Sequence, residues 1–138
     1  MQSNYLFVYG SLLSGFKSPA YEYIARYFEL LGPATVAGTL YDLGEYPAAL
    51  PDSSGRKIIG ELYKIRHTHQ LSYAIAQLDG YEGVNPEAGE TADYKRELSQ
   101  VFHNQEPFEA WVYWFSHNIN DRPVIESGDV LEYLNSRR

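Results

Sequence analysis

Two stretches of the sequence decide the fold class: YKRELSQVF at residues 94–102 and FEAWVYWF at residues 108–115. Both are rich in aromatic and other strand-forming side chains, which favour extended backbone. Five residues, His103-Asn104-Gln105-Glu106-Pro107, separate the two stretches. That spacing is typical of a β-hairpin with a slightly long loop, so the sequence predicts an antiparallel strand pair here.

Further strands are predicted in the N-terminal half. Residues 5–9 form a continuous apolar run, YLFVY, which indicates a buried strand that stops at Gly10. Residues 35–41 alternate between apolar and polar and are rich in strand-forming side chains. Residues 48–50 are short and apolar, and we expect them to be extended.

A fourth predicted strand covers residues 57–65, KIIGELYKI. Gly60 lies in its middle, which indicates a bulge or a close approach of another segment. Ser53-Ser54-Gly55 has the composition of a hairpin turn. We therefore expect residues 57–65 to pair with the extended piece at residues 48–50.

Two helices are predicted from apolar spacing near 3.6 residues. The first runs from about Pro19 to Leu31, with Ser18 as its N-cap and Gly32-Pro33 as its end. Thr68 is the expected cap of the second helix, which ends near Gly80. The apolar face of this second helix consists of Leu71, Ala74, Ile75 and Leu78.

The remaining segments complete the expected architecture. Residues 84–91 show no periodicity and indicate a loop, and a last short helix is expected at about residues 129–135. Short strands joined mostly by hairpins, with two or three helices, favour an antiparallel sheet or small barrel over a doubly wound parallel sheet.

Composition narrows the possible partners. The chain has 138 residues and 15.8 kDa, typical of one domain, so we expect a single domain over residues 1–138. Its net charge of −7 has the wrong sign for binding a nucleic-acid backbone. No window is apolar enough for a membrane span, and the start lacks the basic region of a signal peptide. We therefore expect a cytoplasmic protein with no nucleic-acid or membrane partner.

The absence of cysteine excludes thiol nucleophiles, disulfides and thiolate metal sites. His67 and His69 share one face of an extended segment, but no third ligand is near them in the sequence, so no metal site is expected. Any chemistry must use oxygen, nitrogen and backbone groups, and no cofactor is expected.

The first candidate site is Tyr9-Gly10-Ser11-Leu12, where a buried strand ends in a glycine turn. Successive backbone amides in such a turn can point outward together and bind an anion such as a carboxylate. An ordinary connection between a strand and a loop would have the same local pattern.

The second candidate site is Leu78-Asp79-Gly80-Tyr81-Glu82-Gly83, just past the apolar face of the second helix. If Glu82 turned inward, burial would raise the pKa of its carboxyl and make it a usable proton carrier. A carboxylate at a helix end is also often solvated or capping. Asp79, three positions earlier, could cap the turn or pair with Glu82.

Three further side chains are weaker candidates. Arg96, at a strand start, could orient a carboxylate or belong to a solvated face. Tyr113 could offer its hydroxyl to a site or be a core aromatic residue. Tyr46, next to a proline, could line a pocket or form a turn.

Taken together, these segments closely resemble the γ-glutamylcyclotransferase-like family from about Tyr5 to Tyr133. Their order and spacing matter more than any one of them. The matching segments are Val8-Tyr9-Gly10-Ser11-Leu12, Leu78-Asp79-Gly80-Tyr81-Glu82-Gly83, Tyr94-Lys95-Arg96 and Val112-Tyr113.

The resemblance implies an α+β fold, a small mixed, mainly antiparallel β-barrel flanked by two or three helices. It also implies a cofactor-independent reaction in which the α-amine of a γ-glutamyl compound attacks its own γ-carbonyl, releasing an amine and 5-oxoproline. Glu82 would be the general acid/base, and residues Tyr9 to Leu12 would hold the amino-acid end of the substrate. Tyr113 falls on the family's late pocket tyrosine.

Two other functions stay open from the sequence. Asp79 and Glu82 could form the carboxylate pair of a hydrolase acting on a glycosidic bond. Alternatively, the same fold could be a non-catalytic module that binds a small molecule or another protein. The sequence does not reveal the leaving group or the oligomeric state.

Overall fold

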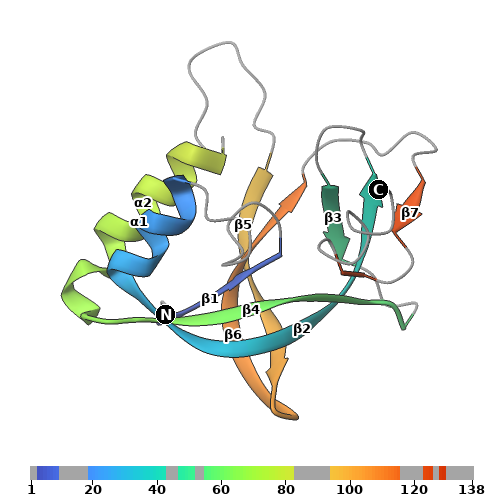
Figure 1. Ribbon diagram of the computed structural model, residues 1–138, viewed down its shortest axis with the longest axis horizontal. Coiled ribbons are helices and arrows are strands. Elements are labelled where there is room, and N and C mark those ends of the chain that lie inside the picture. The colour runs from blue at the N-terminus through green and yellow to red at the C-terminus, as the bar shows by residue number, and fades with distance from the viewer. Residues whose placement is uncertain are drawn as a thin grey trace.

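Five strands of the computed structural model close into a barrel (Figure 1). The barrel strands are β1 (Tyr5–Val8), β2 (Phe28–Asp42), β4 (Lys57–Ile65), β5 (Tyr94–His103) and β6 (Glu106–Phe115). They follow the order β2-β4-β1-β6-β5, and β5 pairs back to β2 at Val36 and Val101. Only the β1–β6 pairing among these is parallel, so the expected mixed, mainly antiparallel barrel is confirmed.

The structure describes residues 3–9, 19–42, 47–51, 55–82, 94–115, 123–125 and 128–129. Strands β3 (Pro47–Pro51) and β7 (Val124–Ile125) pair with β2 outside the barrel. Helices α1 (Pro19–Tyr27) and α2 (Leu71–Glu82) lie together on one side of it, and the short 3-10 helix η1 (Thr68–Gln70) precedes α2 (Figure 1). No helix within the described ranges is long and apolar enough to span a bilayer.

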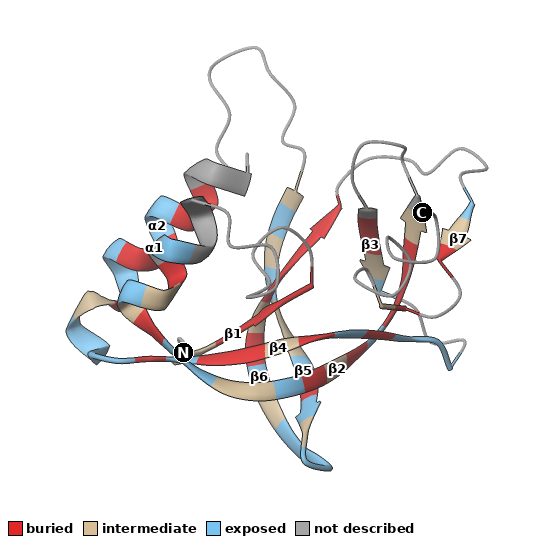
Figure 2. Cartoon of the chain, viewed as in Figure 1, coloured by how far each residue is buried: buried red, intermediate tan, exposed pale blue. Residues whose placement is uncertain are grey.

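Alternation along the strands gives the molecule two cores (Figure 2). In β1, Phe7 faces the barrel interior, whereas Leu6 and Val8 face the helices. The barrel core consists of Phe7, Tyr9, Ala34, Val36, Leu40, Ala49, Ile58, Leu62, Val101, Ala110, Val112, Trp114 and Ile125. The helix-side core consists of Leu6, Val8, Ile24, Phe28, Tyr63, Ile65, Leu71, Ala74, Ile75, Leu78 and Tyr113.

The first helix is shorter than the sequence predicts. It ends at Tyr27, and β2 begins at Phe28, which pairs with Ile65 of β4 and is buried in the helix-side core. Gly32 does not end a helix but lies within β2, next to a shift in strand register after Leu30. The pairing with β4 outweighs the local helical spacing, because neighbouring strands satisfy the backbone over the whole stretch.

Strand β4 has the predicted bounds, and Gly60 marks a close approach: a Cβ there would lie 2.1 Å from the carbonyl oxygen of Val8. The predicted pairing with the preceding extended piece is wrong. β4 pairs with β2 and β1, and β3 instead pairs with the C-terminal end of the long β2. Ser53 and Ser54, in the predicted turn, lie outside the described residues.

The hairpin between β5 and β6 has a tighter turn than predicted. Only Asn104 and Gln105 separate the strands, with φ of 51° and 68°. Two consecutive positive φ values are those of a two-residue hairpin turn, whose twist matches the flanking strands. The expectation of a slightly long loop is therefore wrong.

The apolar face of α2 is confirmed, since its four predicted members are all buried. Thr68 is not a cap: it begins η1, and the extended residue before it is His67. The helix continues past Gly80 to Glu82. The predicted loop at residues 84–91 lies outside the described part of the chain, as does most of the predicted last helix; its first residue, Asp129, forms a parallel bridge with Ile59.

Candidate functional site

Asp79 is a buried carboxylate in the last turns of α2. It is 5% exposed and lies four residues after Ile75, on the face of the helix that packs against the barrel. Arg96 donates two hydrogen bonds to it, from Nε to Oδ1 at 2.8 Å and from Nη2 to Oδ2 at 3.0 Å. The Tyr113 hydroxyl donates a third, to Oδ1 at 2.8 Å.

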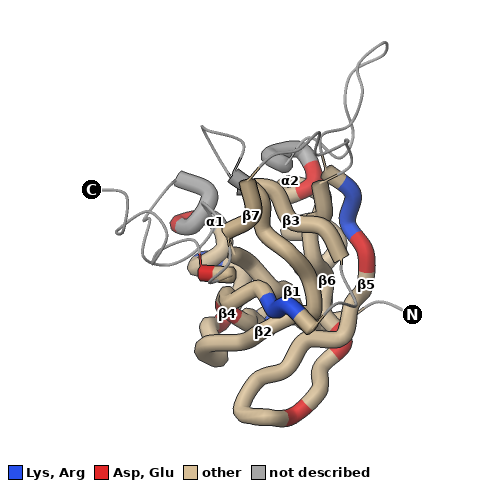
Figure 3. The backbone as a smooth tube through the Cα atoms, turned by 90° about the vertical axis from the view of Figure 1, so that its right-hand side faces the viewer, with Lys and Arg blue, Asp and Glu red and all other residues tan. Residues whose placement is uncertain are grey.

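The strand register brings these partners together. Arg96 of β5 pairs directly with Tyr113 of β6, and directly paired residues project on the same face of a sheet. That face is the outer one, which α2 covers, so both side chains meet Asp79 there. Figure 3 shows the acidic segment of α2 beside the basic segment at one end of β5.

An aromatic side chain completes this group. The Arg96 guanidinium lies 4.3 Å from the centroid of the Trp111 ring, and Trp111 Nε1 donates to the Ser3 carbonyl oxygen at 3.2 Å. A cation over an indole face is attractive and leaves the guanidinium edge available for the carboxylate. We refer to Asp79, Arg96, Trp111 and Tyr113 as the Asp79 cluster.

Tyr113 also connects the cluster to the end of β1. The hydroxyl of Tyr9, the first residue after β1, donates to the Tyr113 carbonyl oxygen at 2.5 Å. Tyr113 thus bonds to Tyr9 through its backbone and to Asp79 through its side chain. Two segments that are far apart in the sequence therefore lie next to the same residue.

The sequence-predicted residues fall into two groups. Tyr9, Arg96 and Tyr113 are described and lie in one connected network. Glu82 is the last residue of α2, three positions after Asp79, but its side chain lies outside the described part, as do residues Gly10, Ser11, Leu12 and Tyr46.

Asp79 has partners that the sequence did not suggest. The sequence suggested a cap or a pairing with Glu82, whereas the structure pairs Asp79 with Arg96 and Tyr113. A carboxylate that accepts three hydrogen bonds, two of them from a guanidinium, is well suited to holding structure. It is correspondingly less suited to moving a proton.

A small pocket of about 140 Å³ borders the cluster. Its lining consists of Leu71, Ser72, Ile75, Ala76, Asp79, Arg96 and Trp111. Pockets that enclose small-molecule ligands are commonly about 300–1,000 Å³, so these described residues alone do not form a cavity for a γ-glutamyl compound.

Sequence reasoning missed Trp111 as a partner of Arg96 and missed the burial of Asp79. The signal for Asp79 was present, because it follows Ile75 by four residues and Leu71 by eight, which extends the apolar face of α2. No comparable signal existed for Trp111, since its contact with Arg96 depends on the strand register.

Known proteins match almost the whole chain. The family described as "Gamma-glutamyl cyclotransferase, AIG2-like" matches residues 6–132. The chain is 31% identical over 128 residues to the "Gamma-glutamylcyclotransferase family protein YtfP" of Escherichia coli K12. That alignment covers 92% of this chain and 96% of the relative.

Solved structures are similar over the same length. The solution NMR structure of ytfP from Escherichia coli has a TM-score of 0.63 and 28% identity, and the match covers 94% of this chain and 97% of that one. The crystal structure of YkqA from Bacillus subtilis has a TM-score of 0.70 at 20% identity, a likeness of fold. It covers 99% of this chain, which spans 44% of YkqA.

These matches agree with the segments that carried the resemblance in the sequence. The family match covers all four of them, and the relative at 31% identity is aligned over nearly its full length. The chain therefore belongs to the γ-glutamyl cyclotransferase, AIG2-like family.

Proposed function

We propose that the protein is a γ-glutamylcyclotransferase-type enzyme that acts on a γ-glutamyl amine or γ-glutamyl amino acid. The α-amine of the substrate attacks the γ-carbonyl carbon, a new C–N bond closes the ring, and the original amide C–N bond breaks. The products are 5-oxoproline and the released amine. Because nucleophile and electrophile belong to one molecule, holding the bent conformer contributes effective molarities of roughly 10⁵–10⁸ M.

One observation carries this proposal: the double link through Tyr113. Tyr9 leads into the Gly10 to Leu12 segment, and Asp79 lies three residues before Glu82 in the same helix. Tyr9 and Asp79 each form a hydrogen bond with Tyr113. The residues from which the anion-binding segment and the acid/base residue follow in the sequence are therefore neighbours of one residue. Family membership and the name of the Escherichia coli relative support the same reaction.

In the proposed mechanism Glu82 moves the proton. It accepts a proton from the attacking α-amine and returns one to the departing nitrogen, so no net charge is gained. The backbone amides of Gly10, Ser11 and Leu12 hold the α-carboxylate of the substrate. Burial of Glu82 would raise the pKa of its carboxyl toward that of the amine and make this transfer easier.

The cluster geometry argues against the hydrolase alternative. A paired-carboxylate hydrolase needs both acidic groups directed at the scissile bond. The Asp79 carboxylate instead accepts hydrogen bonds from Arg96 and Tyr113 on both of its oxygens. Asp79 is therefore poorly placed to act as the second catalytic carboxylate.

The decisive test is Glu82→Gln. We expect this variant to fold and to lose about 10²–10⁴-fold in turnover, because it removes the proton carrier and preserves the shape of the side chain. The measurement is mass-balanced release of 5-oxoproline from γ-glutamyl amines, γ-glutamyl amino acids and glutathione, followed by mass spectrometry.

Glu97→Gln is the matched control, since Glu97 is a half-exposed carboxylate on β5 that pairs only loosely with Lys95 at 3.9 Å. It should keep wild-type turnover. Unchanged 5-oxoproline release by Glu82→Gln would remove Glu82 from the mechanism. Binding of these compounds by the wild-type chain without any product would instead indicate a binding module.

A further inference from the structure

We propose that Arg96 is a positioning residue that acts through Asp79. In this arrangement Arg96 and Tyr113 hold the last turn of α2 against the barrel, and Arg96 does not bind the substrate's carboxylate. The inference rests on the proposed function in one respect, namely that the turn carries the acid/base Glu82. It deepens that function by naming what holds the acid/base in place.

One edge of the Arg96 guanidinium is already bound to Asp79. Nε and Nη2 bond to the two Asp79 oxygens, and its planar face lies against Trp111. The Arg96 side chain is 23% exposed, and that of Asp79 is 7% exposed. Binding a substrate carboxylate through this edge would leave the buried Asp79 charge without its cationic partner, which is costly.

The hydrogen-bonded pair of Arg96 and Asp79 is directional, so it is suited to fixing the position of the end of α2. Leu78 also anchors the end of α2 in the helix-side core, but apolar packing tolerates small rotations and shifts. A bidentate guanidinium–carboxylate pair permits much less freedom, because both hydrogen bonds must stay aligned. Residues three apart on a helix lie on neighbouring positions of one face, so the geometry of Asp79 constrains Glu82.

The cluster is also built from rigid elements. Arg96 and Tyr113 are directly paired within the long β5–β6 ladder, near the end opposite its turn, and the indole nitrogen of Trp111 donates a hydrogen bond to Ser3. No basic residue lies in the last turn of α2 itself. The positive charge that holds this turn thus comes from the barrel rather than from the helix.

A positioning role and a substrate-binding role predict different kinetics. A catalytic group displaced by about 1 Å can lose about 10²-fold in rate while substrate binding is little affected. Loss of a group that binds substrate equally in the ground and transition states raises KM and leaves kcat unchanged. The two roles also predict different double variants. If Arg96 acts through Asp79, substituting both residues lowers the rate no more than substituting one, whereas independent roles give additive losses.

The experiment compares Arg96→Met, Asp79→Asn, their double variant and the milder Arg96→Lys, with Lys95→Met as the control. Lys95 is the neighbouring exposed cation on β5 and contacts Glu97 instead of the cluster. We expect each single cluster variant to lower kcat by about 10²-fold with KM little changed, and the double variant to be no worse than either single one. Lys95→Met should match the wild type.

Hydrogen exchange provides a readout that does not depend on activity. In Arg96→Met and Arg96→Lys we expect amides of residues 79–82 to exchange roughly tenfold faster or more, while amides of the barrel strands keep their protection. Lys95→Met should leave the whole pattern unchanged. The double variant should show the same faster amide exchange at residues 79–82.

The outcomes separate the two hypotheses. An Arg96 variant with a raised KM, an unchanged kcat and an effect additive with Asp79→Asn would overturn the positioning role. Unchanged exchange at residues 79–82 would overturn it as well. If the wild-type chain releases no 5-oxoproline from any γ-glutamyl compound, the proposed function fails, and the exchange data alone decide whether the cluster holds the turn.

Discussion

At the scale of single residues, Gly60 shows how closely the barrel strands approach one another. A Cβ at this position would lie 2.1 Å from the Val8 carbonyl oxygen and 2.7 Å from Cζ of Phe7. Both obstacles are hard to move, because one is backbone and the other belongs to a ring in the barrel core. Only a residue without a side chain lets β1 and β4 pair at this distance.

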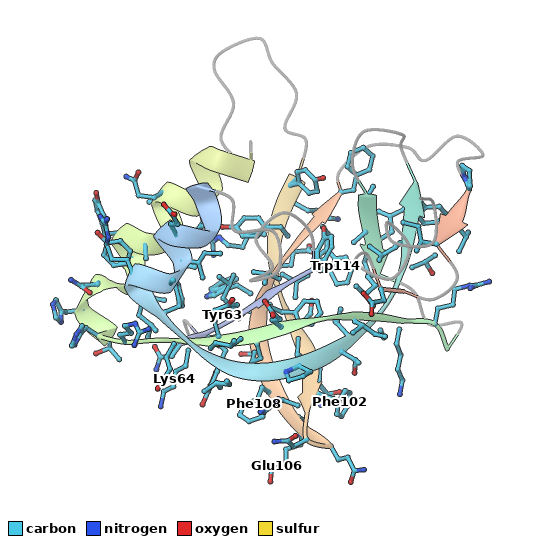
Figure 4. The ribbon with its side chains drawn as sticks, in the orientation of Figure 1. Tyr63, Lys64, Phe102, Glu106, Phe108 and Trp114 are labelled. Carbon is cyan, nitrogen blue, oxygen red and sulfur yellow. The ribbon has the colours of Figure 1, made fainter. Side chains whose placement is uncertain are left out.

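The variant Gly60→Ala should therefore lower the free energy of unfolding by about 1–3 kcal/mol. The overpacking outweighs the smaller gain from restricting the unfolded chain. Urea denaturation followed by circular dichroism measures the difference. Lys64→Ala, an exposed position on the same strand (Figure 4), should change stability by less than about 0.5 kcal/mol. Equal stability of Gly60→Ala and the wild type would show that the strands can separate at little cost.

At the scale of elements, the β5–β6 hairpin determines which side chains meet. Its two-residue turn sets Arg96 opposite Tyr113, and a register shift of one residue would move one partner to the other face of the sheet. Gln105 adopts φ of 68° in this turn, a conformation that costs an ordinary residue about 1–2 kcal/mol. The hairpin is held in register despite that cost by its long ladder.

Replacing Gln105 with glycine should stabilise the protein by about 0.5–1 kcal/mol, since Asn-Gly is the preferred pair for this turn. Thermal unfolding provides the measurement. Glu106→Gly is the control and should lower the melting temperature. Glu106 lies beside the turn at the start of β6 (Figure 4), where glycine weakens a strand. A lower melting temperature for Gln105→Gly would contradict the assigned turn.

At the scale of the whole molecule, the two cores share their strands. β1, β4 and β6 each contribute side chains to the barrel core and to the helix-side core. Trp114 is buried in the barrel core (Figure 4), while Tyr113, the residue directly before it in the chain, packs under α2. Because one backbone supports both cores, we expect them to unfold together as one domain.

Leu78→Ala tests this expectation from the helix side. It should destabilise the protein by about 2–5 kcal/mol through the cavity that it leaves. In a Trp111→Phe background, Trp114 fluorescence and far-ultraviolet circular dichroism should report the same shifted transition. If the signal of Trp114 kept its original midpoint while helical signal was lost earlier, the two cores would be independent units.

The sequence by itself determined the main parts of this protein. The bounds of β4 and the buried face of α2 follow from local periodicity and residue type. Residue type at Gly60 left a bulge or a close approach open, the strand pattern left a sheet or a small barrel open, and the family resemblance implied the barrel. The four segments that carry the family resemblance are visible without any coordinates, and the family match at residues 6–132 confirms the family. Such features are local, so they leave a local pattern.

Only the tertiary structure decided how those parts meet. The sequence predicts a helix at Phe28, which lies in a strand because β4 pairs with it. Strand β4 in turn pairs with β2 and β1 instead of β3. The sequence suggests that Asp79 caps a turn or pairs with Glu82, whereas in the structure it is buried against Arg96 and Tyr113. These outcomes depend on strand register and on which face a helix covers. Both are set by contacts between residues far apart in the sequence, which no local pattern records.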